Sequence, residues 1–574
     1  MRLLVLGLLL AAASPLFGGT PDIVRRNYID ELVLGKMQRD HVPHAPLSGD
    51  TEFLRRITLD LTGRLPEPEA IRKFTADQDP SKREKLIDGM MATKFGLQIE
   101  KLRTPFIDRW AYFFGELFRN GTAQQGMGRN MFHDYIYDSL LLNLPYNEMV
   151  EEMITAKTRS NWRDGPSNLL IRDHVDGVKD FEGINDEDSY DEMAITTTKL
   201  FLGVNLECIS CHDGARHLEK INLWLAQRKR TDLWRQASFF SRSRVFRPYS
   251  IGQEFGLLDD GTGYDLKSKS VVRMERYPAD VSPHFLLTGE QPAQGQNWRA
   301  AYARMITSNA QFPRTIVNLI WAELMGAGIV DPPLDFDLAR QDPKNPPPAP
   351  WTLQPSNPEL LDALAKDFVE HHYDLRYLIR TIVTSSTYQL SSHFEGEWKE
   401  RYGSYFARHT VRRLSPEQVC DAIQSATGVF EEIPIAGTTG KVSRVMQSRS
   451  PEDLSGEKLK PMQHLLIAFG QNNRDKGEKE TGGSTVQASV LMNSQFVKSR
   501  IRPSAENRMG KLLAHNPPLS NGEIVEEMFL AFCSRYPNPE EKKAGIEVLE
   551  KYHDQGLEDL AWSLVNKAEF ILNN

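Results

Sequence analysis

The chain has 574 residues, of which 40% are hydrophobic and 25% charged, and its formal net charge is −8 at pH 7. This composition is that of a globular protein with room for two or three domains. The mild negative charge argues against nucleic acid as the main partner, because phosphate binding requires a basic excess or a basic stripe. Four cysteines are too few for a disulfide scaffold, so a hydrophobic core must stabilise the fold.

The N-terminal stretch has the pattern of a secretory signal peptide. Arg2 supplies a positive charge, residues 3–13 form an apolar run too short to span a bilayer, and small residues follow. An uncleaved anchor is the alternative, which Ser14 and Pro15 disfavour because they interrupt the run. Residues 1–19 are therefore predicted to direct export to the periplasm or the cell surface. No later segment contains about 18 consecutive apolar residues, so no transmembrane segment is predicted in the mature chain.

Hydrophobic residues recur with helical spacing along the next part of the chain. Apolar positions at i, i+3 and i+7 within residues 54–61 predict one helix. Residues 106–119 and 131–156 each predict a further amphipathic helix. Residues 22–245 are therefore predicted to form an N-terminal helical domain.

Carboxylates gather in what is predicted to be an acidic loop over residues 173–192. They are Asp173, Asp176, Asp180, Glu182, Asp186, Glu187, Asp188, Asp191 and Glu192. Clustered carboxylate oxygens are ligands for calcium, so calcium is a candidate ligand here. The spacing is not that of an EF-hand, and a solvated acidic loop is the alternative.

The composition changes between residues 246 and 295, where Gly and Pro are more frequent. Residues 264–277, YDLKSKSVVRMERY, predict one or two strands. Residues 246–295 are therefore predicted to be a β-containing linker region. The predicted fold class is mainly α, with two helical domains and a small β-containing linker or insertion near residues 250–290.

Helical patterns resume in residues 296–574, the predicted C-terminal helical domain. Asn357 followed by Pro358 predicts the start of one helix, with an N-cap and a proline in the first turn. Ser415 and Gln418 have the spacing of a capping box at the start of another. Predicted helices nearer the C-terminus cover residues 465–469, 523–536, 540–552 and 557–572.

The segment CISCH contains the pattern C-x-x-C-H, which is the signature of covalent haem attachment. If the segment begins a helix, Cys208, Cys211 and His212 share one face. Two thiols then reach the two vinyl groups of the porphyrin, and one imidazole reaches the iron. The sequence therefore predicts haem c on Cys208 and Cys211, with His212 as the proximal iron ligand.

Two other chemistries remain open for this segment. Cys208 and Cys211 could form a redox-active disulfide in an oxidising compartment. Zinc could take both thiols together with His212 and His217, although four ligands from ten residues is a tight arrangement. The remaining cysteines, Cys420 and Cys533, lie on apolar helix faces and are predicted to be structural.

The second axial ligand of a haem must come from elsewhere in the chain. Its candidates are Met193, Met274, His284, Met462, His464 and Met492. Arg216 and His217 lie close after the motif and could neutralise the propionates instead. Without a second protein ligand, the iron would be five-coordinate and able to bind small molecules.

The chain resembles the planctomycete-type cytochrome-associated secreted proteins. The matching segments of the first half are FLRRITLDLTGRLPEPEAI, FIDRWAYFFGEL, YNEMVEEMITA and TKLFLGVNLECISCHD. Those of the second half include FPRTIVNLIWAELMGAGIVDPPLDF, RRLSPEQVCDAI and LEDLAWSLVNKAEFILNN. The resemblance implies two domains of unknown function, the first with a haem site at Cys208, Cys211 and His212.

The chain departs from the pattern of these proteins at three places. Residues 213–217 replace an HPFD-like run after the motif, Leu319 replaces a common arginine, and Asn357 replaces a common histidine. Activities that depend on those groups are therefore not implied here.

Two functions from different classes follow from these observations. The first is an exported haem c protein that transfers electrons, with a redox partner protein. The second is a secreted binding or scaffold protein, or a hydrolase of a surface polymer, without haem. Asn472, Arg474 and Thr485 could line a polar site for the second function, although a solvated loop is the alternative. No hydrolase motif is present, so whether the chain is an enzyme stays open.

Overall fold

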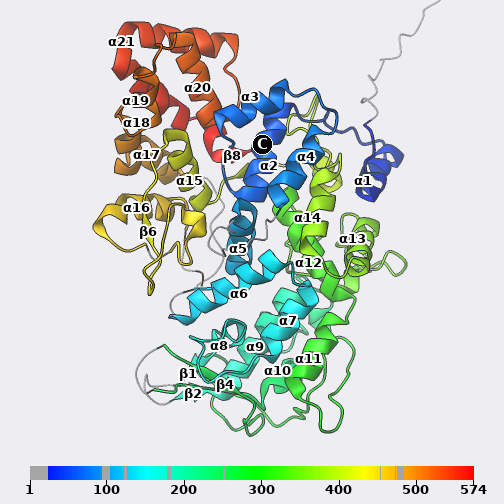
Figure 1. The fold of residues 1–574 in the computed structure, drawn as a ribbon. Coiled ribbons are helices and arrows are strands. Elements are labelled where there is room, and N and C mark those ends of the chain that lie inside the picture. Colours follow the sequence, from blue (N-terminus) through cyan, green and yellow to red (C-terminus); the bar gives the residue numbers. More distant parts are fainter. Residues whose placement is uncertain are drawn as a thin grey trace, which may run out of the picture.

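The computed structural model describes residues 23–92, 104–121, 126–177, 183–249, 253–452, 454–471, 474 and 484–574. Helices account for 53% of the residues and strands for only 4%, so the prediction of a mainly α chain is confirmed (Figure 1). The predicted signal peptide lies outside the described residues. Within the described ranges, no helix is both long and apolar enough to cross a membrane.

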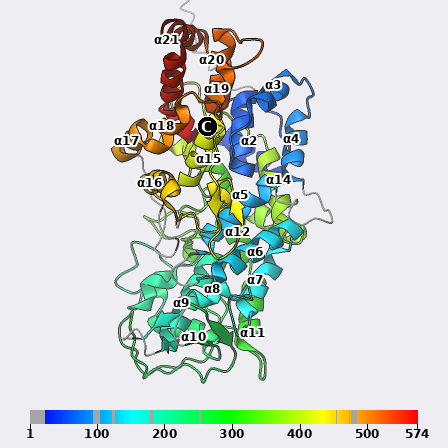
Figure 2. The ribbon, with the colours of Figure 1, turned by 60° about the vertical axis from the view of Figure 1, so that its left-hand side comes forward.

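Fourteen helices come from the first two thirds of the described chain (Figures 1 and 2). They are α1 (Tyr28–Arg39), α2 (Asp50–Thr62), α3 (Pro68–Ala76), α4 (Lys82–Met91), α5 (Pro105–Leu117), α6 (Gly128–Leu142), α7 (Tyr146–Thr155), α8 (Asn168–Ile171), α9 (Asp186–Leu202), α10 (Arg230–Ala237), α11 (Trp298–Thr307), α12 (Gln311–Met325), α13 (Pro358–Glu370) and α14 (Leu375–Thr384). The predicted N-cap of α13 is confirmed, since the Asn357 side chain accepts the N–H of Leu360. The prediction of one helix over residues 131–156 is wrong. Asn143, at φ 55°, and Pro145 separate α6 from α7.

The later helices pack together at one end of the molecule (Figures 1 and 2). They are α15 (Pro416–Thr427), α16 (Lys460–Ala468), α17 (Thr485–Asn493), α18 (Gln495–Ile501), α19 (Arg508–Leu513), α20 (Asn521–Cys533) and α21 (Pro539–Val565). The capping box of Ser415 and Gln418 is confirmed, and Gly428 ends α15 at φ 73°. Non-helical dihedral angles at His553, φ 50° and ψ −122°, divide α21 into two helical parts, as the two separate predictions for this region expected.

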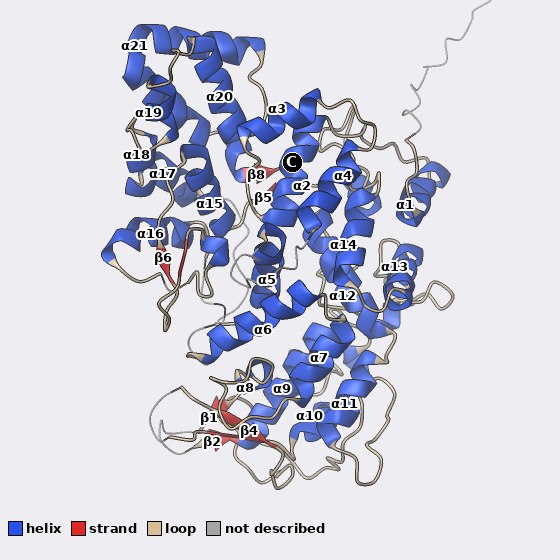
Figure 3. Ribbon diagram, viewed as in Figure 1, coloured by secondary structure: helices blue, strands red, loops and turns tan. Residues whose placement is uncertain are grey.

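Strands are short and occur in antiparallel pairs among the described residues (Figure 3). The pairs are β1 (Val175–Asp176) with β2 (Ile184–Asn185), β3 (Arg244–Phe246) with β4 (Gly256–Leu258), β5 (Arg412–Arg413) with β8 (Leu572–Asn573), and β6 (Ile433–Pro434) with β7 (Lys441–Val442). The prediction of strands within residues 264–277 is wrong, because this segment is held by ion pairs instead of a ladder. The Arg276 guanidinium lies 2.7 Å from Asp188 and 3.0 Å from Asp191 of α9.

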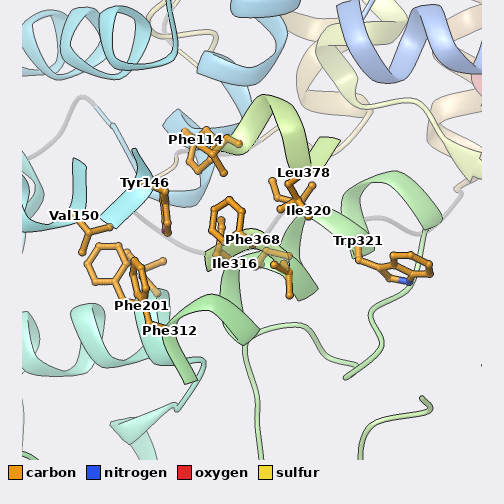
Figure 4. Close-up of a cluster of buried hydrophobic side chains, with 14 of the residues drawn as sticks. Phe114, Tyr146, Val150, Phe201, Phe312, Ile316, Ile320, Trp321, Phe368 and Leu378 are labelled. Atoms are coloured by element: carbon orange, nitrogen blue, oxygen red, sulfur yellow. The ribbon is translucent and has the colours of Figure 1, made fainter. Parts of the chain in front are cut away.

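The larger hydrophobic cluster joins residues from both halves of the chain. Figure 4 shows its centre, where Phe114 of α5 and Tyr146 of α7 meet Phe312 of α12. The rings of Tyr146 and Phe312 are stacked, with centroids 5.4 Å apart. The cluster extends in sequence from Ile29 to Ala407, and it also includes Leu530 of α20. Packing therefore joins the helices on both sides of residues 246–295 into one core.

A second hydrophobic cluster forms among the later helices. It contains residues of α15, α16 and α20, and it also takes Leu59 of α2 and Leu65 from the first part of the chain. Phe53 and Ile57 of α2 belong instead to the larger cluster. Helix α2 therefore lies between the two cores, which explains why residues 53–62 are all buried.

Two buried arginines of α2 bind the C-terminal end of the chain, which lies beside α2 in Figures 1 and 2. Arg55 donates to the carbonyl oxygens of Phe570 and Leu572 at 2.9 and 3.1 Å. Arg56 donates to the carbonyl oxygen of Asn574 at 2.7 Å. Buried backbone acceptors need such donors, so the RR pair of FLRRITLD has a structural role.

His409 lies fully buried in the same region and gives a prediction for acid stability. Burial, together with the nearby Arg56 and Arg412 guanidinium groups, lowers the pKa of His409 well below 6.5. The folded chain then keeps the ring neutral, while the unfolded chain binds a proton below pH 6.5. This contribution to stability is present above pH 6.5 and is lost as the pH falls. At pH 5.5 the loss is expected to be about 1.4 kcal/mol.

Urea unfolding at pH 7.5 and pH 5.5 tests this expectation, with His409→Gln as the comparison. The variant removes the titrating group, so its free energy of unfolding should fall less between the two pH values. Equal falls in the two proteins would show that His409 is not the group responsible.

Candidate functional site

The CISCH segment follows α9 directly. Gly203 ends α9 at φ 65°, and the Asn205 side chain accepts the N–H of Glu207 to begin the 3₁₀-helix η2 (Leu206–Ser210). The assumption that the motif begins an α-helix is therefore wrong. The Ser210 hydroxyl donates to the Glu207 carbonyl at 2.7 Å, and this local bond stabilises the tighter turn.

Both thiols of the motif are free. Cys208 is exposed and Cys211 is half-buried, and neither forms a disulfide. Burial and the carboxylates of Glu207 and Asp335 raise the pKa of the Cys208 thiol. Reactive dithiol pairs depend on a lowered thiol pKa, so this environment does not favour the disulfide-exchange alternative.

His212 is oriented by a hydrogen bond to its own turn. Its Nδ1 lies 2.9 Å from the Asp213 carbonyl oxygen. A carbonyl oxygen only accepts, so Nδ1 is the donor of this bond, and in the neutral ring Nε2 is then the nitrogen with the free lone pair. Histidines that bind metals are commonly held in this way. The His217 ring lies against His212, with centroids 4.2 Å apart.

The zinc and calcium alternatives find little geometric support. Within the described ranges, no three His, Cys, Asp or Glu side chains converge as a metal site. The acidic loop predicted over residues 173–192 is helical from Asp186 onward. Glu192 pairs with Arg273 at 2.6 Å, and Asp188 and Asp191 pair with Arg276, as described above. Asp180 and Glu182 lie outside the described residues.

The residues that replace the HPFD-like run fasten the motif to its neighbours. Asp213 accepts the backbone N–H of Arg230 at 2.9 Å. The backbone at Gly214 passes so close to Leu225 that a Cβ would lie 2.0 Å from its carbonyl oxygen. Arg230 also donates to the Ser210 carbonyl at 3.3 Å. Asp213 and Gly214 are thus explained by packing against residues 225–230.

The structure places the six candidates for a second axial ligand in different surroundings. Met193 is buried in the larger core, Met462 is buried in the second core, and His464 and Met492 are carried by the later helices α16 and α17. His284 bonds to Ser282 and Gln291. Met274 is 61% exposed, and its carbonyl accepts from Arg230 at 3.0 Å. Arg230 therefore links the backbone of Met274 to that of Ser210, which lies within the motif.

Cys420 and Cys533 are buried on α15 and α20, which confirms their predicted place on apolar faces. Burial raises the pKa of the Cys533 thiol to about 12. Such thiols are protonated and inert, so they take no part in the chemistry of the site.

A central cavity of about 480 Å³ lies next to the motif. Helices α5, α9 and α12 contribute most of its wall, together with the start of α15. The wall contains Arg109, Tyr112, Phe113, Glu116, Leu117, Arg119, Arg172, Glu192, Ile195, Thr196, Lys199, Leu200, Asn205, Glu207, Leu319, Glu323, Leu334, Ser415, Gln418, Met446 and Arg474. Glu207 directly precedes Cys208 in the chain. Leu334 directly precedes Asp335, whose carboxylate raises the pKa of Cys208. The motif therefore lies at one edge of this cavity.

Arg474, predicted as a candidate binding residue, is only 4% exposed and lines the cavity. It is paired with Glu116. Burial opposes its charge, but the carboxylates of Glu116 and Glu452 raise the pKa of the guanidinium above its ordinary value. Thr485 begins α17 and is not part of the described wall, while Asn472 lies outside the described residues. The polar site around Arg474 is therefore formed with residues other than Thr485.

The other charged residues of the wall were not predicted from the sequence. Arg109 and Glu116 lie seven residues apart on α5, and Glu192, Thr196 and Lys199 follow one face of α9. Charged residues at helical spacing are normally solvent-facing. A polar row beside an otherwise buried helix face, as in FIDRWAYFFGEL, is the signal that could have indicated an internal cavity.

The geometry describes a mainly α protein with an accessible C-x-x-C-H turn beside a charged cavity. Residues 28–244 match the family PSCyt2, described as a protein of unknown function (DUF1549). Residues 298–549 match the family PSD1, described as a protein of unknown function (DUF1553). The order of the two matches is consistent with the planctomycete-type two-domain arrangement. No curated protein and no solved structure matches the chain.

Proposed function

We propose that the protein is an exported haem c protein with a redox role outside the cytoplasm. The observation that carries the proposal is the orientation of His212, whose Nδ1 is held by the Asp213 carbonyl and whose Nε2 is therefore the nitrogen left for a metal. Cys208 and Cys211 supply free thiols beside it. The family matches support the arrangement in which such a motif occurs, and the signal peptide predicted at residues 1–19 supports export.

The residues present fit a covalently attached haem. Cys208 and Cys211 would each add their S–H across one vinyl group, which forms two thioether bonds and needs no oxidant. His212 would ligate the iron through Nε2, and Arg216 and His217 would neutralise the propionates. The bound haem would supply one-electron chemistry. A redox partner protein would give the electron to it or take the electron from it.

Expression with haem-maturation machinery in a periplasm tests this function. The purified protein should give a positive haem-stained gel and a pyridine haemochrome spectrum typical of thioether-linked haem. Cys208→Ser and Cys211→Ser should each reduce the haem content, whereas Cys533→Ser should keep it. A colourless parent protein, obtained while a control cytochrome matures in the same cells, would refute the proposal.

A secreted binding protein is the second candidate, and the central cavity is the observation that favours it. A cavity of about 480 Å³ lies within the size range of small-molecule sites. A ligand could occupy this cavity whether or not haem is attached to the chain. No arrangement of residues in the described part of the chain favours a particular hydrolase.

A further inference from the structure

The central cavity has an excess of positive charge. Each of its glutamates has an arginine partner: Glu116 pairs with Arg474, Glu323 with Arg109, and Glu192 and Glu207 with Arg273. Lys199 also lines the cavity, and within the described ranges it forms no ion pair. The half-buried ammonium group of Lys199 therefore lacks a carboxylate to neutralise it.

Two buried arginines lie in the same wall, and each already forms an ion pair. Arg109 and Arg172 are 5% and 6% exposed. The Nε atom of each is buried without an acceptor among the described residues. Buried donors in native proteins are nearly always satisfied. These Nε atoms are not exposed to the cavity, and the two guanidinium groups pair with Glu323 and with Asp173. A negative charge on a ligand in the cavity would therefore complement Lys199.

The remaining wall favours a ligand that carries hydroxyl groups. The carboxylates of Glu116 and Glu323 already receive arginine hydrogen bonds, but each has further lone pairs to accept from a hydroxyl. Thr196, Asn205 and Gln418 add small polar groups. A hydroxyl group both donates and accepts, so it suits a wall in which donors and acceptors alternate.

Apolar groups occupy the spaces between these polar residues. Phe113, Leu200 and Leu334 present ring and methyl surfaces to the cavity. Small-molecule sites characteristically combine such apolar surface with a few polar groups that fix orientation. The C–H face of a saturated ring would cover the apolar part while its hydroxyls reach the polar part.

From these observations we infer that the cavity binds a small polyhydroxylated organic anion of the sugar-acid type. Its acidic group lies toward Lys199, and its hydroxyls bond the glutamates and amides. Leu319 adds no charge to this wall, so Lys199 remains its unpaired cation among the described residues. The inference stands whether or not haem is attached at Cys208 and Cys211.

Isothermal titration calorimetry on the full chain tests this binding site. The probes are glucuronate, glucose 6-sulfate and glucose, which share a ring and differ in the acidic group. Glucuronate is expected to bind saturably, and glucose is expected to bind about tenfold more weakly or not at all, because it lacks the charge-assisted bonds. Glucose 6-sulfate distinguishes a general oxyanion site from one specific for carboxylates.

Variants of Lys199 locate the site. Lys199→Gln should weaken glucuronate binding about tenfold or more, and Lys199→Arg should restore most of it. The matched control, Lys511→Gln on the exposed side of α19, should bind like the parent. Circular dichroism melts define a temperature at which all of the proteins are folded. Glucose binding as tightly as glucuronate, or unchanged binding by Lys199→Gln, would overturn the inference, as would the absence of binding by both anionic probes.

Discussion

Replacement of Arg56 by methionine is expected to lower the free energy of unfolding by about 3–5 kcal/mol. The Arg56 guanidinium is fully buried and donates to the carbonyls of Tyr388, Leu390 and Asn574 and to the carboxylate of Glu52. Methionine preserves much of the volume but donates nothing, so buried acceptors lose their partner. Urea unfolding followed by circular dichroism gives the free-energy difference.

Arg39→Met is the control for this experiment. Arg39 is 62% exposed, and its nearest carboxylate, that of Glu359, is 4.0 Å away. Exposed pairs of this kind contribute little, so the variant should stay within about 0.5 kcal/mol of the parent. A small effect at Arg56, similar to that at Arg39, would mean that the C-terminal tail does not depend on α2.

Replacement of His212 by alanine is expected to change the iron coordination of the matured protein. The proposed thioether bonds would involve Cys208 and Cys211 and not His212, so part of the colour of a haem-loaded protein should remain. The visible and near-ultraviolet spectrum should become that of an iron without its imidazole ligand. Added imidazole should then restore much of the parent spectrum, because it supplies the missing nitrogen ligand.

His217→Ala is the matched comparison, since the His217 ring lies only 4.2 Å from the His212 ring. This variant should keep the parent spectrum, because His217 is predicted to act near the propionates and not at the iron. Loss of the parent spectrum in His217→Ala, with no change in His212→Ala, would reverse the two roles.

Local signals in the sequence predicted the helices well. The caps at Asn357, Ser415 and Gly428 occur as predicted, because capping depends on residues within one turn. The strands predicted within residues 264–277 do not form. There, β propensity was outweighed by Arg273 and Arg276, which reach carboxylates of α9 more than 80 residues away in sequence.

The candidate site was only partly predictable for the same reason. Cys208, Cys211 and His212 are neighbours in sequence, so their spacing identified them at once. The cavity wall instead brings together Arg109, Lys199, Glu323 and Arg474 from four distant segments. No local pattern records that convergence, because it depends on how α5, α9 and α12 pack.

The mass of the peptide that contains the motif tests the central claim most directly. Trypsin cleaves after Lys199 and Arg216, which releases residues 200–216 with both Cys208 and Cys211. After maturation in a periplasm, this peptide should carry the mass of one haem bound through two thioether bonds. Recovery of the unmodified peptide alone, while a control cytochrome in the same cells carries haem, would contradict the account.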